Sequence, residues 1–297
     1  MRAIGTLRAE PYRDARATRH HRPAAPRRRR PAGAGCPAPR RRAHPDRPDR
    51  MRLTRVHVPG PLAAGATLEL APRAGQHLVR VLRLERGAPL AVFDGRGREH
   101  AATIASIRDA RVRVLVGAAR AAAAESPLSI TLAQGVSRGE RMDYAIQKAT
   151  ELGVARIVPL LCERSVVKLE SGQAGRKLEH WQGVAAAAAE QCGRAVVPEI
   201  GAPRRCLEHL GTAGALAPGA GRLVLVPLAT HGPGALPAGL ERIELLIGPE
   251  GGLSEAESQA AALAGYAPLR LGPRVLRTET AAAAAIAVLQ ARYGDLA

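Results

Sequence analysis

Aromatic side chains and long apolar runs are both scarce in this sequence. Phe, Trp and Tyr supply only 2% of the 297 residues, yet apolar residues still reach 46%, so Ala, Val, Leu and Ile must fill any core. The longest apolar runs are interrupted within about a dozen residues, whereas roughly 20 are needed to span a bilayer. The sequence therefore excludes a wholly disordered chain and predicts no transmembrane helix.

Paired cysteines and clustered histidines are missing as well. The four cysteines, Cys36, Cys162, Cys192 and Cys206, show no C-x-x-C spacing, and the nine histidines form no H-E-x-x-H motif. Neither a zinc ribbon nor a disulfide framework is indicated, and no metal site is expected. Reduced thiols are the default for such a pattern, so we expect a cytoplasmic protein.

Residues 1–50 contain no lysine, no serine and few large apolar side chains. Their 15 arginines and four acids give a charge of +11, whereas the remaining 247 residues, with 29 basic and 22 acidic side chains, carry +7. We expect this proline-rich segment to be disordered, and it resembles neither a secretory signal nor a transit peptide. The arginine runs 27–30 and 40–42 are compatible with a nucleic-acid-binding tail. The preferred interpretation is that the folded protein begins at Met51 and residues 1–50 are an upstream extension.

Residues 51–123 predict a small β-barrel or sandwich. Asp94-Gly95 is typical of a hairpin turn, and the spacing of Leu78, Val81 and Leu82 predicts a helix over residues 76–84. Five short strands with one helix in about 70 residues are typical of a small barrel. The strand-like runs are 53–58, 67–70, 89–93, 101–107 and 112–116.

Residues 124–297 predict an α/β domain. Ser254 and Glu257 have the spacing of a capping box, so a helix should open at Ser254. The closing helix is apolar nearly all round and should be buried or lie in an interface. Alternation of strands and helices predicts a mostly parallel sheet covered by helices. We expect strands at 128–133, 155–161, 223–228, 243–247 and 268–271, and the other helices at 139–152, 177–192 and 279–293.

Two glycine-rich segments each follow an expected strand and precede an expected helix. They are IGPEGGLS, residues 247–254, and LGPRVLRTETA, residues 271–281. Neither matches G-x-G-x-x-G or a P-loop. A tight strand-to-helix turn would explain either one alone. Because ligands of open α/β sheets bind at the carboxyl ends of strands, two such loops side by side predict one pocket, suited to a nucleoside whose adenine edge is read by backbone groups.

Two further segments combine charge with a position at an element boundary. QGVSRGERMDY, residues 134–144, lies at a strand-to-helix junction, and EQCGR, residues 190–194, closes the long helix. Taken singly, each charge is better explained as part of a solvated helix face.

Taken together, six segments resemble the 16S ribosomal RNA uridine-N3 methyltransferase family. They are SRGERMD, KATELG, ERSVVKL, AAAEQCGR, LIGPEGGLSEAE and LGPRVLRTETA, and the similarity runs in order over residues 51–297, weakest between 211 and 239. In that family S-adenosylmethionine methylates uridine 1498. The resemblance implies a PUA-like β-barrel RNA-binding domain over residues 51–123 and a SPOUT methyltransferase domain with a trefoil knot over residues 124–297. Residues 1–50 have no counterpart.

The resemblance also implies a homodimer with the methyl-donor pocket beside the subunit interface. One wall would be formed by Ile247, Gly248, Pro249, Gly251 and Gly252. The second would be formed by Leu271, Gly272, Arg274, Val275, Leu276 and Thr280, and the third by Pro227 and Leu228.

The chemistry of uridine suggests roles for three charged residues. N3 carries a proton and is a poor nucleophile until that proton leaves, and in-line approach at roughly 3–3.5 Å supplies much of the acceleration. The hypothesis is that Glu279, or a nearby backbone group, helps to remove the proton, while Arg194 or Arg138 stabilises the uridine anion. Glu279 can equally be a favourable charge at a helix N-terminus.

A basic surface would bind the RNA phosphates. With so few aromatic residues, base stacking is not a broad strategy, and specificity would depend on the shape of the small ribosomal subunit. Two alternatives stay open: a SPOUT methyltransferase acting on another RNA such as transfer RNA, and a non-catalytic ribosome-assembly factor, although a pure binder needs no donor pocket. The predicted RNA-binding residues are Arg80, Arg83, Arg138, Arg141, Lys148, Arg164 and Lys168.

Overall fold

The computed structural model describes residues 53–109, 111–167 and 172–296. The predicted disordered segment 1–50, the expected start at Met51 and the candidate RNA-binding residue Lys168 all lie outside the described residues. No helix in the described ranges is both long enough and apolar enough to cross a membrane.

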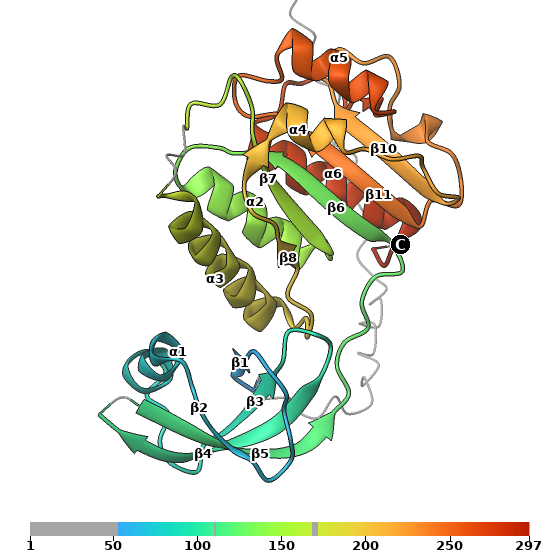
Figure 1. Ribbon diagram of the computed structural model, residues 1–297. Coiled ribbons are helices and arrows are strands. Elements are labelled where there is room, and N and C mark those ends of the chain that lie inside the picture. Colours follow the sequence, from blue (N-terminus) through green and yellow to red (C-terminus); the bar gives the residue numbers. More distant parts are fainter. Residues whose placement is uncertain (1–52, 110, 168–171, 297) are drawn as a thin grey trace, which may run out of the picture. The chain divides into compact units, whose positions relative to one another are not determined.

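The first part of the described chain is a five-stranded sheet in the order β1-β3-β4-β5-β2 (Figure 1). Its antiparallel strands are β2 (Thr67–Glu69), β3 (Pro89–Phe93), β4 (Glu99–Arg108) and β5 (Arg111–Arg120), and β1 (Arg55–His57) joins β3 in parallel. Val56, Leu78, Leu90, Ile104 and Val114 fill its core. The predicted strand-rich N-terminal fold is therefore confirmed.

Local signals explain where this part agrees with the expected elements and where it differs. The hairpin turn at Asp94-Gly95 is present, with Gly95 at φ +75° and the Asp94 carboxylate accepting hydrogen bonds from the Arg96 and Arg98 amides. The helix begins earlier than expected, because Pro72 is suited to the first helical turn. It runs as α1 (Pro72–Gln76) and continues as a π-helical segment, η1 (His77–Val81).

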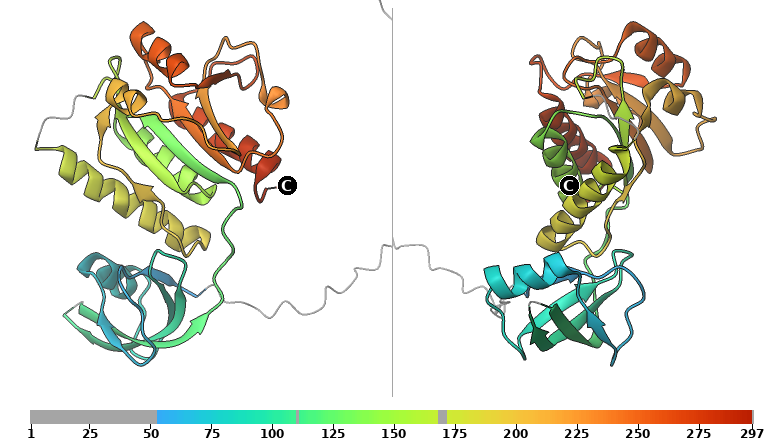
Figure 2. Two further views of the ribbon diagram at one scale, coloured as in Figure 1. Left: turned by 45° about the vertical axis from the view of Figure 1, so that its right-hand side comes forward. Right: turned by 60° about the vertical axis from the view of Figure 1, so that its left-hand side comes forward.

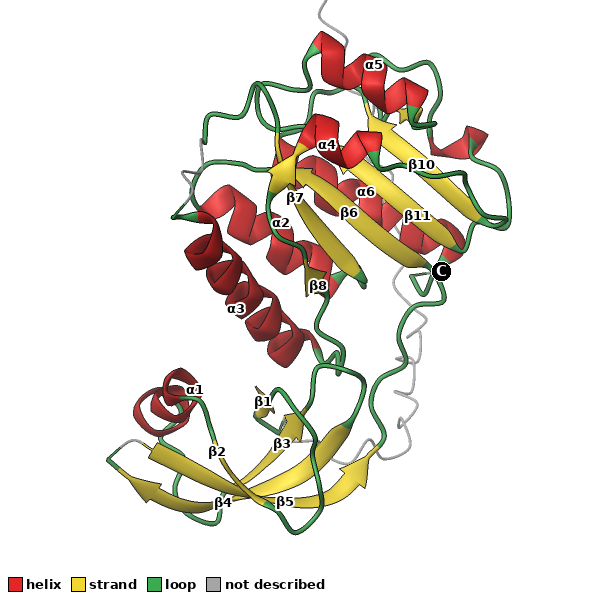
Figure 3. Cartoon of the chain, viewed as in Figure 1, coloured by secondary structure: helices red, strands yellow, loops and turns green. Residues whose placement is uncertain are grey.

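The second part is a seven-stranded sheet in which all strand pairs are parallel (Figure 3). The order is β12-β10-β11-β6-β7-β8, and β9 also pairs with β7. Its strands contain near-continuous hydrophobic runs, and not an alternation of apolar and polar residues, as is typical of parallel sheets covered on both faces. The predicted parallel α/β fold is confirmed. The strands are β6 (Ser129–Gly135), β7 (Arg156–Leu161), β8 (Glu199–Ile200), β9 (Arg204–Arg205), β10 (Ala220–Leu225), β11 (Arg242–Ile247) and β12 (Ala267–Leu269).

Helices cover both faces of this sheet. On one face, Leu245 and Ile247 of β11 pack in a core with α2 (Glu140–Glu151), α3 (Ala174–Cys192) and α6 (Thr278–Tyr293), and Figure 2 shows α2 and α3 side by side there. On the other, Leu246 packs with residues of α4 (Cys206–Gly211) and α5 (Glu255–Leu263). Alternate residues of one strand therefore serve two cores. A short 3₁₀ helix, η2 (Pro233–Ala235), precedes β11.

One expected adjacency is wrong. β11 and β12 follow each other in sequence, but β10 lies between them in the sheet. The two glycine-rich loops therefore do not follow neighbouring strands, although Thr278 of the second contacts Gly248 of the first. Strand β10 also ends at Leu225 rather than near residue 228, and Leu228 is 94% exposed.

Candidate functional site

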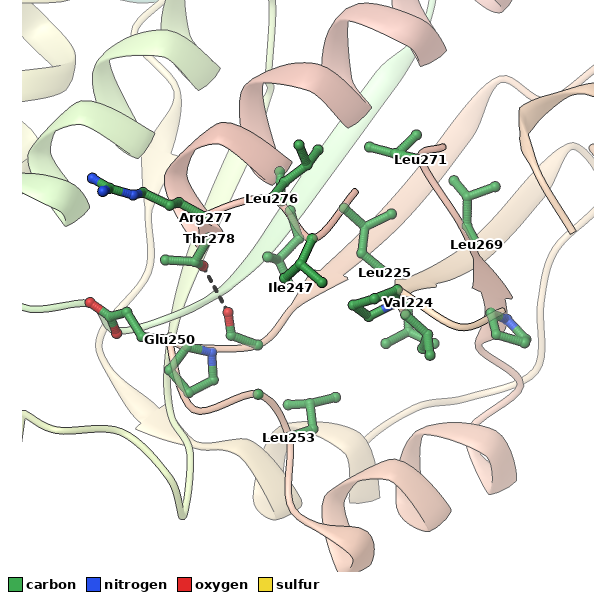
Figure 4. A pocket seen from close by; sticks show the side chains of 18 of the residues that line it. Val224, Leu225, Ile247, Glu250, Leu253, Leu269, Leu271, Leu276, Arg277 and Thr278 are labelled. Atoms are coloured by element: carbon green, nitrogen blue, oxygen red, sulfur yellow. Dashed lines mark hydrogen bonds between the residues drawn. The ribbon is translucent and has the colours of Figure 1, made fainter. Parts of the chain in front are cut away.

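A cavity of about 840 Å³ opens at the carboxyl ends of β10, β11 and β12 (Figure 4). The loops after these three strands and the first turn of α6 form its walls. It is lined by ten of the predicted donor-binding residues: Pro227, Ile247, Gly248, Pro249, Gly252, Leu271, Gly272, Arg274, Val275 and Leu276. The structure therefore brings the three predicted wall segments together in one pocket, at the strand ends where ligands of open α/β sheets bind.

Three of the predicted donor-binding residues do not line the cavity. Leu228 extends into solvent because the strand ends before it, and Thr280 is exposed on α6. Gly251 faces the loop after β7, where a Cβ would lie 2.9 Å from the Arg164 carbonyl oxygen. Gly251 therefore allows two loops to pack closely.

Close backbone packing shapes the loop that follows β11. A Cβ on Gly248 would lie 3.1 Å from the backbone of Gly252 and of Leu253. Gly252 has φ +70°, a conformation that L-residues rarely adopt. The predicted capping box is present: the Glu257 amide donates to the Ser254 hydroxyl, and the Ser254 amide donates to the Glu257 carboxylate. These features fix the course of the loop into α5.

A buried hydrogen-bond chain joins this loop to β6 and α6. The Thr278 hydroxyl donates to the Gly248 carbonyl oxygen at 2.8 Å, drawn as a dashed line in Figure 4. Gln134 Nε2 in turn donates to Thr278 Oγ1 at 2.9 Å. Both residues lie in the segments 134–144 and 271–281 quoted from the sequence, but neither was predicted to have a role of its own. The available signal was a glutamine directly after the apolar residues Leu132 and Ala133.

An ion pair joins the same loop to the start of α2. Glu250 Oε1 accepts from Arg141 Nη1 at 2.9 Å and from the Arg138 amide at 3.2 Å. Burial alone would raise the pKa of Glu250, but hydrogen bonds from its own amide, from Arg141 and from Arg138 hold that pKa below its ordinary value. Arg141 and Glu250 line the cavity, whereas Arg138 is exposed beside it and does not.

Glu279 is the predicted catalytic residue that the structure places at the cavity. It lies in the first turn of α6 and lines the wall, next to Thr278. Its Oε2 atom is buried and has no hydrogen-bond partner within the described residues. An unpaired buried acceptor is unfavourable unless a ligand or water completes it. Glu279 thus combines a place in the cavity wall with a carboxylate oxygen that has no partner within the described residues.

Arg194 is positioned elsewhere, which corrects its predicted place in this site. Its Nη1 atom donates to the carbonyl oxygens of Thr150 and Val154, and its Nη2 atom pairs with Glu125 at 2.6 Å. The guanidinium thus holds the end of α2 and the segment before β6. These donors are occupied, and the residue does not line the 840 Å³ cavity.

The predicted RNA-binding residues differ in their surroundings. Lys148 and Arg141 are each paired with a carboxylate, Glu151 and Glu250 respectively. The residues exposed to solvent are Arg80, Arg83, Arg138, Arg141 and Arg164.

Cys162, Cys206 and Glu257 form a buried cluster whose ligand atoms lie within 4.8 Å of one another. Both oxygens of Glu257 already accept hydrogen bonds, from the amides of Glu163 and Ser254. The hydrogen bond with Cys206, together with burial, raises the pKa of the Cys162 thiol. A raised thiol pKa and a carboxylate already engaged by two backbone amides are typical of groups packed in a core.

Comparison with known proteins adds independent information. A family model described as an RNA methyltransferase domain matches residues 124–290, and one described as an RNA methyltransferase PUA domain matches residues 70–116. The chain is 32% identical over 247 residues to ribosomal RNA small subunit methyltransferase E of Buchnera aphidicola, covering 83% of this chain and 99% of the relative. The namesake in Bacillus subtilis is 30% identical, covering 72% and 86%.

Solved structures give the same picture. A Legionella pneumophila chain with bound SAM is 41% identical, with a TM-score of 0.78, covering 82% of this chain and 100% of that one. Ribosomal RNA small subunit methyltransferase E from Neisseria gonorrhoeae, bound to S-adenosyl methionine, is 35% identical, with a TM-score of 0.75 and the same coverage.

Proposed function

The chain belongs to the ribosomal RNA small subunit methyltransferase E family, and we propose that it transfers a methyl group from S-adenosylmethionine to N3 of uridine 1498 in 16S ribosomal RNA. The observation that carries this proposal is the cavity formed by three strand-end loops, in a chain whose solved relatives hold that donor. The residues that line the cavity fit the donor in size and chemistry.

The cavity suits a nucleoside-containing donor. Its volume of about 840 Å³ falls in the range of roughly 300–1,000 Å³ typical of small-molecule sites. Leu225, Leu269 and Leu276 supply apolar walls for a base and ribose. The glycines of the β11 loop leave backbone groups accessible, because no side chain stands between them and the cavity.

Glu279 is proposed to accept the N3 proton. S-adenosylmethionine supplies an electrophilic methyl group bonded to a sulfonium. When the N3–H proton moves to the Glu279 carboxylate, the lone pair left on N3 can form the new N–C bond, and the electrons of the broken C–S bond stay on sulfur. Two observations support this assignment: Glu279 lines the cavity, and its Oε2 atom has no partner within the described residues.

Arg138 is proposed to stabilise the uridine anion or an adjoining phosphate. Its amide is held by Glu250 while its side chain stays exposed beside the cavity. A cation near the carbonyl oxygens of uridine favours the deprotonated base. Arg194 has no proposed role at the uridine, because its guanidinium is engaged by Glu125 and by two backbone carbonyl oxygens.

The remaining proposals concern organisation. We propose a division into an RNA-binding domain, residues 51–123, and a methyltransferase domain, residues 124–297, with the family's trefoil knot in the latter. We also propose a homodimer, because Ala283, Ala284 and Ala287 leave a half-buried face of small side chains on α6. The substrate would be RNA in the small ribosomal subunit, which places the reaction in the cytoplasm.

Nucleoside mass spectrometry tests the proposal. Small subunits from a strain lacking the gene are incubated with the purified protein, with and without S-adenosylmethionine. We expect 3-methyluridine at one site of 16S RNA, only when the donor is present. Donor binding without this product would redirect the search to transfer RNA, and no donor binding at all would remove the proposed activity.

A further inference from the structure

The side chains of Gln134 and Thr278 form a hydrogen-bond chain beneath the donor cavity. Gln134 Nε2 donates to Thr278 Oγ1 at 2.9 Å, and Thr278 Oγ1 donates to the Gly248 carbonyl oxygen at 2.8 Å. A second bond from Gln134 Nε2 reaches the Gly135 carbonyl oxygen at 3.1 Å. The chain thus joins β6, the loop after β11 and the start of α6, which are separated by up to 144 residues in sequence.

Burial of this hydrogen-bond chain is unfavourable in free energy. Gln134 is 0% exposed and Thr278 is 7% exposed, and Gln134 occupies a strand whose neighbours Leu132 and Ala133 are apolar. The Oε1 atom of Gln134 has no partner within the described residues. An apolar side chain would avoid the unfavourable burial of that acceptor. Stability of the sheet alone therefore does not account for a glutamine at this position.

The two groups at the end of the chain belong to the cavity wall. Gly248 and Thr278 both line the cavity, whereas Gln134 does not. The Thr278 hydroxyl fixes the direction of the Gly248 carbonyl, and Gln134 fixes the Thr278 hydroxyl. Thr278 is also followed directly by Glu279, so the same anchor holds the first turn of α6.

We propose that Gln134 and Thr278 are positioning residues that hold the β11 loop and the start of α6 at the separation required for donor binding. The inference rests on the proposed function for the identity of the donor. Gln134 acts through Thr278 and does not touch the donor. A hydrogen bond that joins two walls of one pocket orders them before the donor binds, so the entropy cost of binding is smaller.

Thr150 provides a matched control. Like Thr278 it is a buried threonine, and its hydroxyl donates to the Ile146 carbonyl oxygen at 2.8 Å. It lies in α2 and does not line the cavity. Replacing either threonine by valine removes one buried hydroxyl with little change in shape, so the two variants should lose similar stability but differ in their effect on the donor.

The experiment measures the Kd for S-adenosylmethionine by titration calorimetry, and the Tm without donor, for five proteins. Thr278→Val should weaken binding about tenfold, in keeping with loss of one buried hydrogen bond, and Thr278→Ser should retain near-normal binding. Gln134→Met should weaken binding in the same direction. Thr150→Val should lower the Tm and leave the Kd unchanged.

Two further readouts separate positioning from general destabilisation. The double variant Gln134→Met/Thr278→Val should weaken binding by less than the product of the single effects, because both act through one bond to Gly248. In turnover assays the KM for the donor should rise while the KM for the RNA stays the same.

The outcomes are distinguishable. If the wild-type protein binds the donor and Thr278→Val binds it with the same Kd, the positioning role is overturned and the proposed function stays intact. Equal weakening by Thr150→Val would also overturn it. Failure of the wild-type protein to bind the donor would overturn the donor assignment itself, and the positioning role with it.

Discussion

Glu250 and Arg141 form an ion pair between the loop after β11 and the first turn of α2, with Arg141 Nη1 and Glu250 Oε1 2.9 Å apart. The same oxygen of Glu250 accepts the Arg138 amide. One carboxylate therefore holds both the arginine that lines the cavity and the arginine proposed to act beside it. Because the Arg141 side chain is 47% exposed, the pair should add little to global stability.

Replacing Glu250 by alanine should affect the site more than the fold. We expect a loss of stability of at most about 1 kcal/mol, since solvent screens this pair, but a several-fold weaker Kd for S-adenosylmethionine because the loop loses its tie to α2. Glu151→Ala is the control, since Glu151 pairs with Lys148 on the same helix away from the cavity. Equal effects of the two variants on the donor Kd would contradict the expectation.

Glu279→Gln tests proton removal. The variant keeps the size of the side chain but loses a base, so we expect single-turnover methylation to fall by roughly 10²-fold or more, the scale typical of general-base loss. The donor Kd should change little. Rapid-quench assays with saturating RNA give the rate, and calorimetry gives the Kd. A variant with near-normal turnover would assign proton removal to another group.

Gly248→Ala tests the close packing of the β11 loop. The new Cβ would lie 3.1 Å from the backbone of Gly252 and Leu253, so the loop must move. We expect at least a tenfold weaker donor Kd. Gly211→Ala is the control, because a Cβ on Gly211 would meet no atom within 4 Å. If both alanine variants bound the donor normally, the loop backbone would not define the pocket.

Local signals in the sequence predicted much of this structure. The Ser254 and Glu257 capping box and the Asp94-Gly95 turn appear as expected, because each depends on residues within a few positions. The parallel fold followed from alternating strand and helix patterns. Strands β8 and β9, each two residues long, were too short to show any periodicity and were missed.

Long-range relationships could not be predicted from the residues alone. The position of β10 between β11 and β12 depends on chain threading, not on local pattern. Arg194 lies in a charged motif, yet its partners Thr150, Val154 and Glu125 are about 40 to 70 residues away and fix it outside the cavity. The same holds for the contact between Gln134 and Thr278. Charge and motif indicate candidate residues, and only packing decides which ones meet.

Asp94 should make stability depend on acidity. Burial alone would raise the pKa of Asp94. Hydrogen bonds from the Arg96 and Arg98 amides and from the Arg98 guanidinium outweigh this effect and hold the pKa below its ordinary value of 3.8. A depressed folded pKa contributes stability above the unfolded pKa, and that contribution is lost as pH falls through the folded value. Asp94→Asn should therefore destabilise the protein at neutral pH, and the difference should shrink below pH 3.8. Urea unfolding over a pH series measures it, and a pH-independent difference would contradict the assignment.

Arg80 and Arg83 should contribute to RNA affinity through charge alone. Both are exposed at and just after η1, and neither forms an ion pair within the described residues. Each lost phosphate contact should lower the slope of log K against log salt by about 0.7 to 0.9. We expect Arg80→Ala/Arg83→Ala to weaken RNA binding with a reduced salt slope and an unchanged donor Kd. Arg108→Ala/Arg111→Ala, at the β4–β5 turn, is a charge-matched comparison. If both double variants lowered affinity and slope equally, RNA binding would depend on net charge and not on a surface at η1.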